Sequence, residues 1–260
     1  MKPSNSQAEA VLELMARHRS VRAFDATPVP DEHIERAVRA AQCAATSSWI
    51  QSYHLIQVVD PDEREQLAAL AGGQAQVHEA GALFVVCGDT RRHELVAEDA
   101  RAARHVTDEV LLLAVIDASL FAQNLTLAFE AMGYGVCYIG GLRNDLDGVD
   151  GLLDLPHGVL PLFGLTVGVP SDPSATRPRL EPTAVWSKGR YPSDGDVRAA
   201  IRRFDQRAAQ HYEQRGLHGR DWSGGLRRKF STALRPRVGP YLREKVGLES
   251  PPEDQAPEGS

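Results

Sequence analysis

The chain has 260 residues, of which 42% are hydrophobic and 25% charged, an ordinary balance for a globular protein. This balance excludes collagen-like, coiled-coil and wholly disordered proteins, and the formal net charge of -6 argues against a dedicated nucleic-acid-binding protein. Three scattered cysteines, Cys43, Cys87 and Cys137, form neither a disulfide framework nor a zinc-binding spacing. Because the N-terminal MKPSNSQAEA also lacks an apolar signal core, we expect a cytoplasmic protein.

Segments with helix-like and strand-like hydrophobic patterns alternate from the N-terminus to about residue 169. In chain order we expect a helix over 8–18, an extended piece over 19–24, a helix capped by Asp31 and running to 41, a strand over 53–59, a helix opened by Asp60-Pro61 and ended by Gly72-Gly73, a strand over 82–87, a long helix over 110–132, a strand over 135–139, a short helix over 148–153 and a strand over 162–167. Together they predict an α+β fold in which helices cover a central sheet.

The long helix over 110–132 is the most apolar stretch of the chain. A transmembrane helix needs about 20 mostly apolar residues with few charges, whereas this stretch is interrupted by Asp117, Gln123, Asn124 and Glu130. We therefore interpret it as a buried core helix that ends at Gly133, and we expect no membrane partner.

The composition changes after Val169. A proline-rich traverse precedes an amphipathic helix whose apolar face runs from Val197 to Tyr212, and Gly216 is expected to end that helix. From Arg215 to Lys245 the chain carries nine Lys or Arg residues against two acidic residues. The segment 248–260 is rich in proline and acidic residues, which predicts disorder.

Several familiar signatures are missing from the sequence. The stretch that begins Gly133-Tyr-Gly135 has Tyr138 where a G-x-G-x-x-G motif needs its third glycine, and it precedes a predicted strand instead of following one. There is no Walker A sequence, no zincin helix and no G-x-S-x-G elbow. The nine histidines form no ligand-like cluster, so we expect no metal.

Four polar clusters remain: His18–Arg22 (HRSVR), Thr46–Ser48 (TSS), Gly140–Asn144 (GGLRN) and Arg177–Arg179 (RPR). Taken singly, a basic run is most often a solvated face, and a glycine pair after a strand is most often a turn. Taken together, they offer guanidinium groups, hydroxyls and backbone N–H groups. Those are the groups that bind a phosphorylated cofactor.

With these clusters in view, the sequence resembles the oxygen-insensitive, NADPH-dependent nitroreductases and flavin reductases that bind FMN tightly, in the larger of the two nitroreductase groups. The resemblance covers about residues 14–241. Its landmarks are RHRSVRAF (17–24), TSSWIQ (46–51), AGGQ (71–74), AMGYGVCYIGGLRND (131–145), LPLFGLTVGVP (160–170), RPRL (177–180), YEQRG (212–216), DWS (221–223) and LRP (234–236).

The resemblance implies a mixed sheet between helix layers and an intertwined homodimer, with two FMN sites at the subunit interface and a C-terminal extension. It divides the chain into an FMN-binding nitroreductase core over 8–190, a helical extension near the active-site mouth over 191–247 and the tail 248–260. In such a dimer the long helix packs against its mate, which would explain why it is apolar on two sides.

The resemblance also assigns residues to the cofactor. His18, Ser20, Arg177 and Arg179 would approach the FMN phosphate, with Arg19 beside them, and the family usually has Lys where Arg177 stands. Arg22 would face the pyrimidine end of the flavin, where a fixed cation stabilises the reduced, anionic ring. The ribityl chain and ring edge would be bound by Thr46, Ser47, Ser48 and Gln74, and the isoalloxazine would lie along Tyr138, Ile139, Gly140 and Gly141.

Three further residues are expected near the substrates. Trp49 matches an aromatic residue on the family's substrate side, although a tryptophan in this context also fits a core position. Arg215 matches an arginine that binds the 2′-phosphate of NADPH, although it also fits a helix C-terminus. Arg235 matches an arginine at the pocket mouth.

The resemblance implies that NADPH reduces bound FMN and that a second substrate, a nitroaromatic, a quinone or a related acceptor, then takes two electrons from the same pocket. Such a ping-pong scheme needs no dedicated acid–base residue, so no catalytic side chain is assigned. A flavin reductase that supplies reduced FMN to a partner shares the same site and stays open. A third alternative, from another class, is a polyanion-binding module that uses the basic residues between Arg215 and Lys245.

Overall fold

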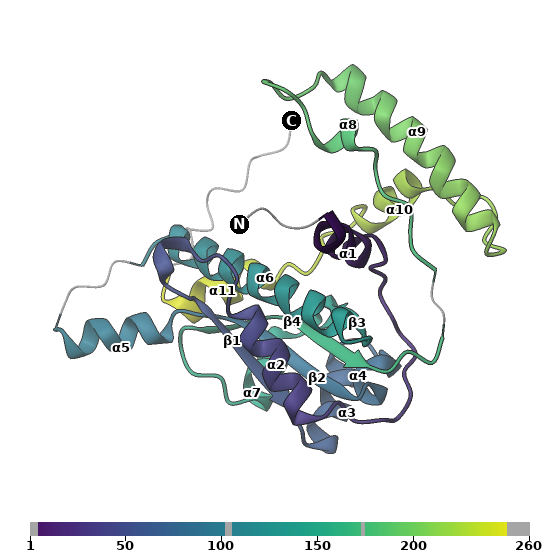
Figure 1. Ribbon diagram of the computed structural model, residues 1–260. Helices are drawn as coiled ribbons and strands as arrows, with labels where there is room; N and C mark the ends of the chain where they lie inside the picture. The colour runs from purple at the N-terminus through teal and green to yellow at the C-terminus, as the bar shows by residue number, and fades with distance from the viewer. Residues whose placement is uncertain (1–4, 102–105, 173–174, 249–260) are drawn as a thin grey trace. The chain divides into compact units, whose positions relative to one another are not determined.

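The computed structural model describes residues 5–101, 106–172 and 175–248, and these divide into two compact units. The first unit comprises the chain up to Ser174 together with the part from Arg235 onward, and the second comprises Ala175–Leu234. Figure 1 labels the helices and strands of both units. The chain is therefore divided after Ser174 and after Leu234, whereas the sequence analysis expected a boundary between 190 and 191. The tail expected to be disordered lies, from 249 onward, outside the described residues.

The first unit contains a four-stranded sheet, eight α-helices and two short 3-10 helices within the described residues. Its strands are β1 (Tyr53–Val58), β2 (Ala82–Asp89), β3 (Gly135–Ile139) and β4 (Val159–Gly168). Its helical elements are α1 (Asn5–Ala16), α2 (Asp31–Ala41), η1 (Ser47–Trp49), α3 (Pro61–Leu70), α4 (Ala75–Glu79), α5 (Arg91–Asp99), α6 (Asp108–Ala131), η2 (Gly140–Asn144), α7 (Leu146–Leu152) and α11 (Val238–Val246).

The strands lie in the order β1-β2-β4-β3, and every neighbouring pair is antiparallel. A mixed sheet was expected to contain parallel pairing. In the described residues, the parallel pairing is a single bridge between Ser20 and Val136 at the β3 edge. The α+β class expected from the sequence is confirmed. The extended piece 19–24 thus adds a short fourth pairing beside β3.

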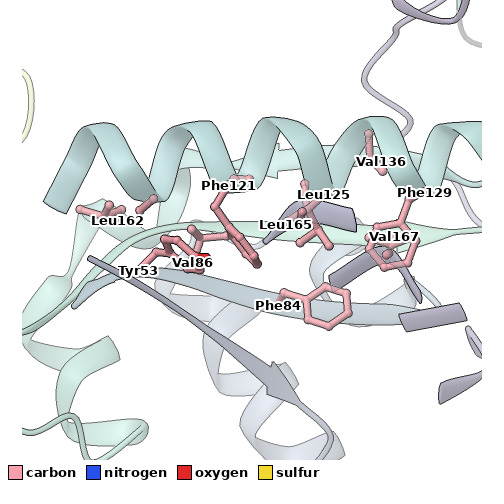
Figure 2. Packing of buried hydrophobic residues seen from close by; sticks show 14 of the residues in the cluster. Tyr53, Phe84, Val86, Phe121, Leu125, Phe129, Val136, Leu162, Leu165 and Val167 are labelled. Carbon is pink, nitrogen blue, oxygen red and sulfur yellow. The ribbon is translucent and has the colours of Figure 1, made fainter. Parts of the chain in front are cut away.

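The larger hydrophobic core lies between α6 and one face of the sheet (Figure 2). Phe121 of α6 stacks on Tyr53 of β1 with ring centroids 4.4 Å apart, and Phe129 stacks on Phe84 of β2 at 5.9 Å. Helix α2 packs against α6 and extends this layer. Aromatic rings therefore align α6 along the sheet and fix which of its residues face the strands.

A second core covers the opposite face of the sheet, where α3 and α7 pack. Because side chains alternate along a strand, Phe84 and Val86 of β2 belong to the first core, whereas Leu83, Val85 and Cys87 belong to the second. All of β2 is buried, as expected for a strand covered by helices on both sides. The two layers together build the framework that carries the site described below.

Helix α6 is the only described helix long and apolar enough to cross a membrane. Its face toward the sheet is buried, whereas Leu112, Ile116 and Leu120 on the other face are exposed in the single chain. The expectation of a core helix with two apolar sides is confirmed.

Local signals set several helix ends as expected. The Asp60 carboxylate accepts hydrogen bonds from the N–H groups of Asp62 and Glu63, and Pro61 is the first helical residue of α3. Gly72, Gly73 and Gly133 have positive φ angles of 87°, 72° and 89° after the ends of α3 and α6. The expected Asp31 cap is wrong, because Asp31 lies inside α2 and Pro30 holds the cap position without a side-chain hydrogen bond.

The second unit contains α8 (Pro182–Val185), α9 (Asp194–Glu213) and α10 (Trp222–Lys229). Phe204 and Ala208 are the buried residues of α9, and Phe204 meets Trp222 of α10 edge to face at 5.4 Å. The Ser193 hydroxyl accepts from the Asp196 N–H at the start of α9, and Gly216 has a φ of 71° after its end. The amphipathic helix and its stop at Gly216 are therefore confirmed.

Candidate functional site

Residues 18–22 lie beside β3 as an edge strand. The Val21 N–H donates to the Val136 carbonyl at 2.9 Å, and Val21 is buried. Side chains alternate along an extended segment, so His18, Ser20 and Arg22 share one side and Arg19 and Val21 the other. Arg19 and Val21 line a separate cavity of about 340 Å³ together with Arg17, Glu130 and Tyr134. Arg19 therefore alternates in direction with His18 and Ser20 along the segment, and it borders a cavity that Glu130 also lines.

His18 is held by a carboxylate that sequence reasoning did not select. Its Nδ1 donates to Oε1 of Glu130 at 2.7 Å, and the Glu130 side chain is only 11% exposed. Because the carboxylate occupies Nδ1, the Nε2 edge of the ring stays available for another group. Glu130 was noted only as a polar interruption of the long helix, which was the one signal that marked it.

A second group of predicted residues meets at the C-terminal end of β3. A Cβ placed on Gly141 would collide with the Gln74 amide nitrogen and the Ala71 carbonyl, so glycine lets the 71–74 loop approach η2. Gln74 Nε2 donates to the Ala71 carbonyl at 2.9 Å, and Gln74 Oε1 accepts from Gln76 at 2.9 Å. Gln74 and Gly141, which are 67 positions apart in sequence, therefore lie side by side.

The residues before the glycine pair point to opposite faces of the sheet. Tyr138 faces the α6 side, where its hydroxyl accepts from Thr126 at 3.1 Å and its ring packs on Phe163 at 5.3 Å. Burial raises the pKa of Tyr138. Ile139 is fully buried in the second core. Because the Ile139 side chain is buried, only the backbone of Ile139 can contact a ligand at this edge.

Arg235 reaches the same edge from the C-terminal part of the first unit. Its Nε donates to Oδ1 of Asn144 in η2 at 2.9 Å. Arg143 beside it donates to the Leu162 carbonyl at 2.6 Å, and burial, with the Arg235 charge, lowers the pKa of Arg143. The structure thus brings Arg235 to the segment that also carries Gly140 and Gly141.

The loop over 46–52 carries the predicted residues Thr46, Ser47, Ser48 and Trp49 between α2 and β1. Ser48, Trp49 and Gln51 have positive φ angles of 48°, 60° and 54°, which non-glycine residues rarely adopt. The Trp49 side chain is 83% exposed. The core position that its sequence also fitted is therefore excluded in the single chain.

In the second unit, Arg177 and Arg179 are exposed and line a cavity of about 290 Å³ with Phe204, His211 and Trp222. Arg215 is exposed just beyond α9, where its N–H donates to the Tyr212 carbonyl at 3.0 Å. Within the described part of the chain, none of the three arginines forms an ion pair. Their guanidinium groups are available for an anion.

In the described residues, no cluster of three or more His, Cys, Asp or Glu side chains is placed to hold a metal. The fold and the groups around β3 thus define an α+β protein that presents cations, hydroxyls and glycine backbone at one sheet edge, a donor set suited to a phosphorylated, redox-active cofactor.

Comparison with known proteins identifies this class. The Nitroreductase family matches residues 15–169, and the Nitroreductase family, C-terminal domain, matches residues 177–249. The FMN reductase (NADPH) of Bacillus subtilis is 40% identical over 220 residues, covering 82% of this chain and 88% of that protein. The oxygen-insensitive NADPH nitroreductase of Salmonella typhimurium is 39% identical over 219 residues, covering 83% and 89%.

Among solved structures, the NADPH:FMN oxidoreductase from Vibrio harveyi complexed with NAD+ is similar with a TM-score of 0.83 and 35% identity, covering 92% of this chain and 98% of that one. The chain belongs to the nitroreductase family. It is an oxidoreductase with the family's fold, as the resemblance implied.

Proposed function

We propose that this protein is an FMN-dependent oxidoreductase that uses NADPH to reduce nitroaromatics, quinones or related acceptors. The observation that carries the proposal is that two groups of these residues adjoin β3: residues 18–22 lie along the strand, and Gln74, Gly141 and Arg235 lie at the η2 segment that follows it. Relatives that are 39–40% identical over more than four fifths of this chain carry names with NADPH, FMN and nitroreductase activity. We further place the enzyme in the cytoplasm.

The chemistry of the donor set fits FMN. A phosphate dianion is bound best by hydrogen-bond donors, above all charged ones, and the Nε2 edge of His18 and the Ser20 hydroxyl lie on one side of the extended segment beside β3. Arg177 and Arg179, assigned to the phosphate by resemblance, stay a prediction. When bound, FMN supplies the two-electron redox chemistry.

The residues of the chain bind and orient the reactants. The glycine pair follows the C-terminal end of β3, and the lack of a Cβ lets its backbone N–H groups approach a ligand closely. Arg22 supplies a positive charge: it is exposed, and its Nη1 donates to the Ser20 carbonyl at 3.5 Å. Thr46, Ser47 and Ser48 supply hydroxyls from a loop of unusual backbone conformation. We assign no acid–base side chain.

We propose that the enzyme is a homodimer. The outer face of α6 exposes Leu112, Ile116 and Leu120, and the neighbouring α1 exposes Val11, Leu12 and Met15. Each of the two helices thus exposes apolar side chains of the kind that mark a protein–protein interface. This arrangement supports the intertwined dimer that the family resemblance implies.

A flavin reductase that hands reduced FMN to a partner is the second candidate, because the Bacillus subtilis relative carries that name. Nothing in the described structure favours the polyanion-binding alternative. The two enzyme candidates share the site and differ in the acceptor.

A visible spectrum of the purified protein tests the proposal. We expect a yellow protein whose flavin bands bleach on addition of NADPH under nitrogen and return with a nitroaromatic or a quinone. Turnover with free FMN that exceeds turnover with these acceptors would favour the flavin reductase. A colourless protein that ignores added FMN would contradict the proposed function altogether.

A further inference from the structure

The 46–52 loop is held by a buried carboxylate that is not among the residues proposed to bind the cofactor or the substrates. Asp117, in α6, is fully buried. Its Oδ1 accepts from the Ser47 N–H at 3.0 Å, and its Oδ2 accepts from the Ser52 N–H at 3.1 Å. Among the described residues it has no ion-pair partner. A buried carboxylate without a cation is costly unless hydrogen bonds stabilise it, and here both come from one loop.

The carbonyl groups of the same loop are held from a different helix. Arg92 of α5 donates to the carbonyl of Gln51 at 3.3 Å and to that of Tyr53 at 3.0 Å. His93 Nε2 donates to the Ile50 carbonyl at 3.1 Å. Two helices therefore bind the loop backbone, one through its N–H groups and one through its carbonyl groups.

This double attachment explains the backbone of the loop. Ser48, Trp49 and Gln51 adopt the left-handed conformation, which non-glycine residues keep only where surrounding contacts over-determine it. Tyr53, the residue after the loop, stacks on Phe121 one turn beyond Asp117, so α6 fixes the end of the loop as well. Such strain clusters at ligand sites, and the indole of Trp49 stays out in solvent as a result.

We propose that Asp117 is a positioning residue that, through the N–H groups of Ser47 and Ser52, holds the 46–52 loop in the backbone conformation that presents the hydroxyls of residues 46–48 and the indole of Trp49 to the flavin. The inference rests on the proposed function. It predicts that Asp117 acts on binding of the ribityl chain and ring, and that it has no part in binding the phosphate.

Asp117→Asn tests the proposal, because an amide of the same size replaces one acceptor by a donor that faces a loop N–H. We expect FMN and riboflavin to bind more weakly by the same factor, about tenfold to a hundredfold, since each loses the same loop contacts. We also expect faster hydrogen exchange confined to the amides of 46–52. Asp150→Asn is the matched control: Asp150 holds α11 through Lys245 and Tyr241, and its variant should change neither readout.

Ser47→Pro and Ser47→Ala form a second pair that needs no change in the core. Both remove the hydroxyl, but only proline removes the N–H that Asp117 binds, and the extended backbone of Thr46 accommodates a following proline. We expect the backbone amides of the 46–52 loop to exchange hydrogen faster in Ser47→Pro than in Ser47→Ala. We also expect Ser47→Pro to bind both flavins more weakly than Ser47→Ala. This comparison decides the question if Asp117→Asn fails to fold.

Unchanged riboflavin and FMN affinity in folded Asp117→Asn would overturn the proposal, and so would a loss of FMN binding with riboflavin binding intact. Exchange that rises throughout the protein would overturn it as well, because it would show a general structural role. If the wild-type protein bound neither flavin, the proposed function would fail, whereas the exchange of the loop amides would still show whether Asp117 holds the loop.

Discussion

Single residues at the β3 edge carry the electrostatics proposed for the flavin, and Arg22 is the clearest case. Arg22→Ala should leave FMN bound, because the phosphate donors remain, and should lower the flavin potential, because the reduced ring loses a nearby cation. Hydride transfer from NADPH should slow about tenfold or more. Redox titration and stopped-flow reduction measure the two effects.

Arg36→Ala, which removes another exposed arginine from the first unit, is the control. An unchanged flavin potential in Arg22→Ala would show that Arg22 does not lie near the flavin ring.

Arg215 is the residue to test for the choice between NADPH and NADH. It is exposed beyond α9 and has no ion pair in the described structure, so its guanidinium can bind the 2′-phosphate. Arg215→Ala should raise the KM for NADPH severalfold to about a hundredfold and leave the KM for NADH nearly unchanged. Steady-state kinetics with both nucleotides measure this. Equal effects on both would assign the arginine to the helix end and move the specificity to Arg235 or another basic residue.

Side chains join elements that are far apart in the sequence. Arg237, at the start of α11, joins α11 to α7 in this way. Its guanidinium donates to the Asp147 carboxylate at 2.8 and 2.9 Å and to the Glu244 carboxylate at 2.8 and 2.9 Å. Hydrogen bonds from Arg237 lower the pKa of both Asp147 and Glu244. The folded state therefore binds these protons less readily than the unfolded state. The resulting stability is present above the ordinary carboxyl pKa of about 4 and is lost as the pH falls through the lowered values.

Arg237→Ala should accordingly lower the melting temperature at pH 7, and the difference from wild type should shrink as the pH falls below about 4. Thermal unfolding across this pH range measures it. Arg39→Ala, which breaks one exposed pair with Glu35 inside α2, should have a smaller effect at pH 7, because a single surface pair contributes little. A difference between Arg237→Ala and wild type that stayed constant into acid would contradict the assignment.

At the element scale, the segments with strong periodic signals were predicted, whereas several short helices were not. Strand β3 was predicted with its observed ends, and β1, β2, α3 and α6 within two residues at each end. Helices α4, α5, α8 and α10 were not predicted as elements. They have four to nine residues, too few for a helical period to stand out, and their ends are set largely by contacts with other elements.

At the scale of the whole molecule, the exposed outer face of α6 is the surface that we propose for the dimer interface. Ile116→Asp should leave the monomer folded, because the side chain is 40% exposed, and should prevent dimer formation by placing a charge in the apolar patch. Leu95→Asp is the matched control, since Leu95 is 43% exposed on α5, outside the patch. Size-exclusion chromatography with light scattering gives the mass in solution. A dimer that survived Ile116→Asp would place the interface elsewhere.

The sequence by itself determined the family, the α+β class and most of the residues proposed for the cofactor, because family motifs and strong periodic segments are local and are read without knowing what they touch. Tertiary structure decided which of these residues meet. It placed Gln74 against Gly141, Arg235 beside Asn144 and His18 against Glu130. It also supplied Asp117 and Glu130, which in the sequence only interrupt an apolar helix. The physical reason is that a buried carboxylate acquires its role from donors brought by distant segments, and no local pattern records those contacts.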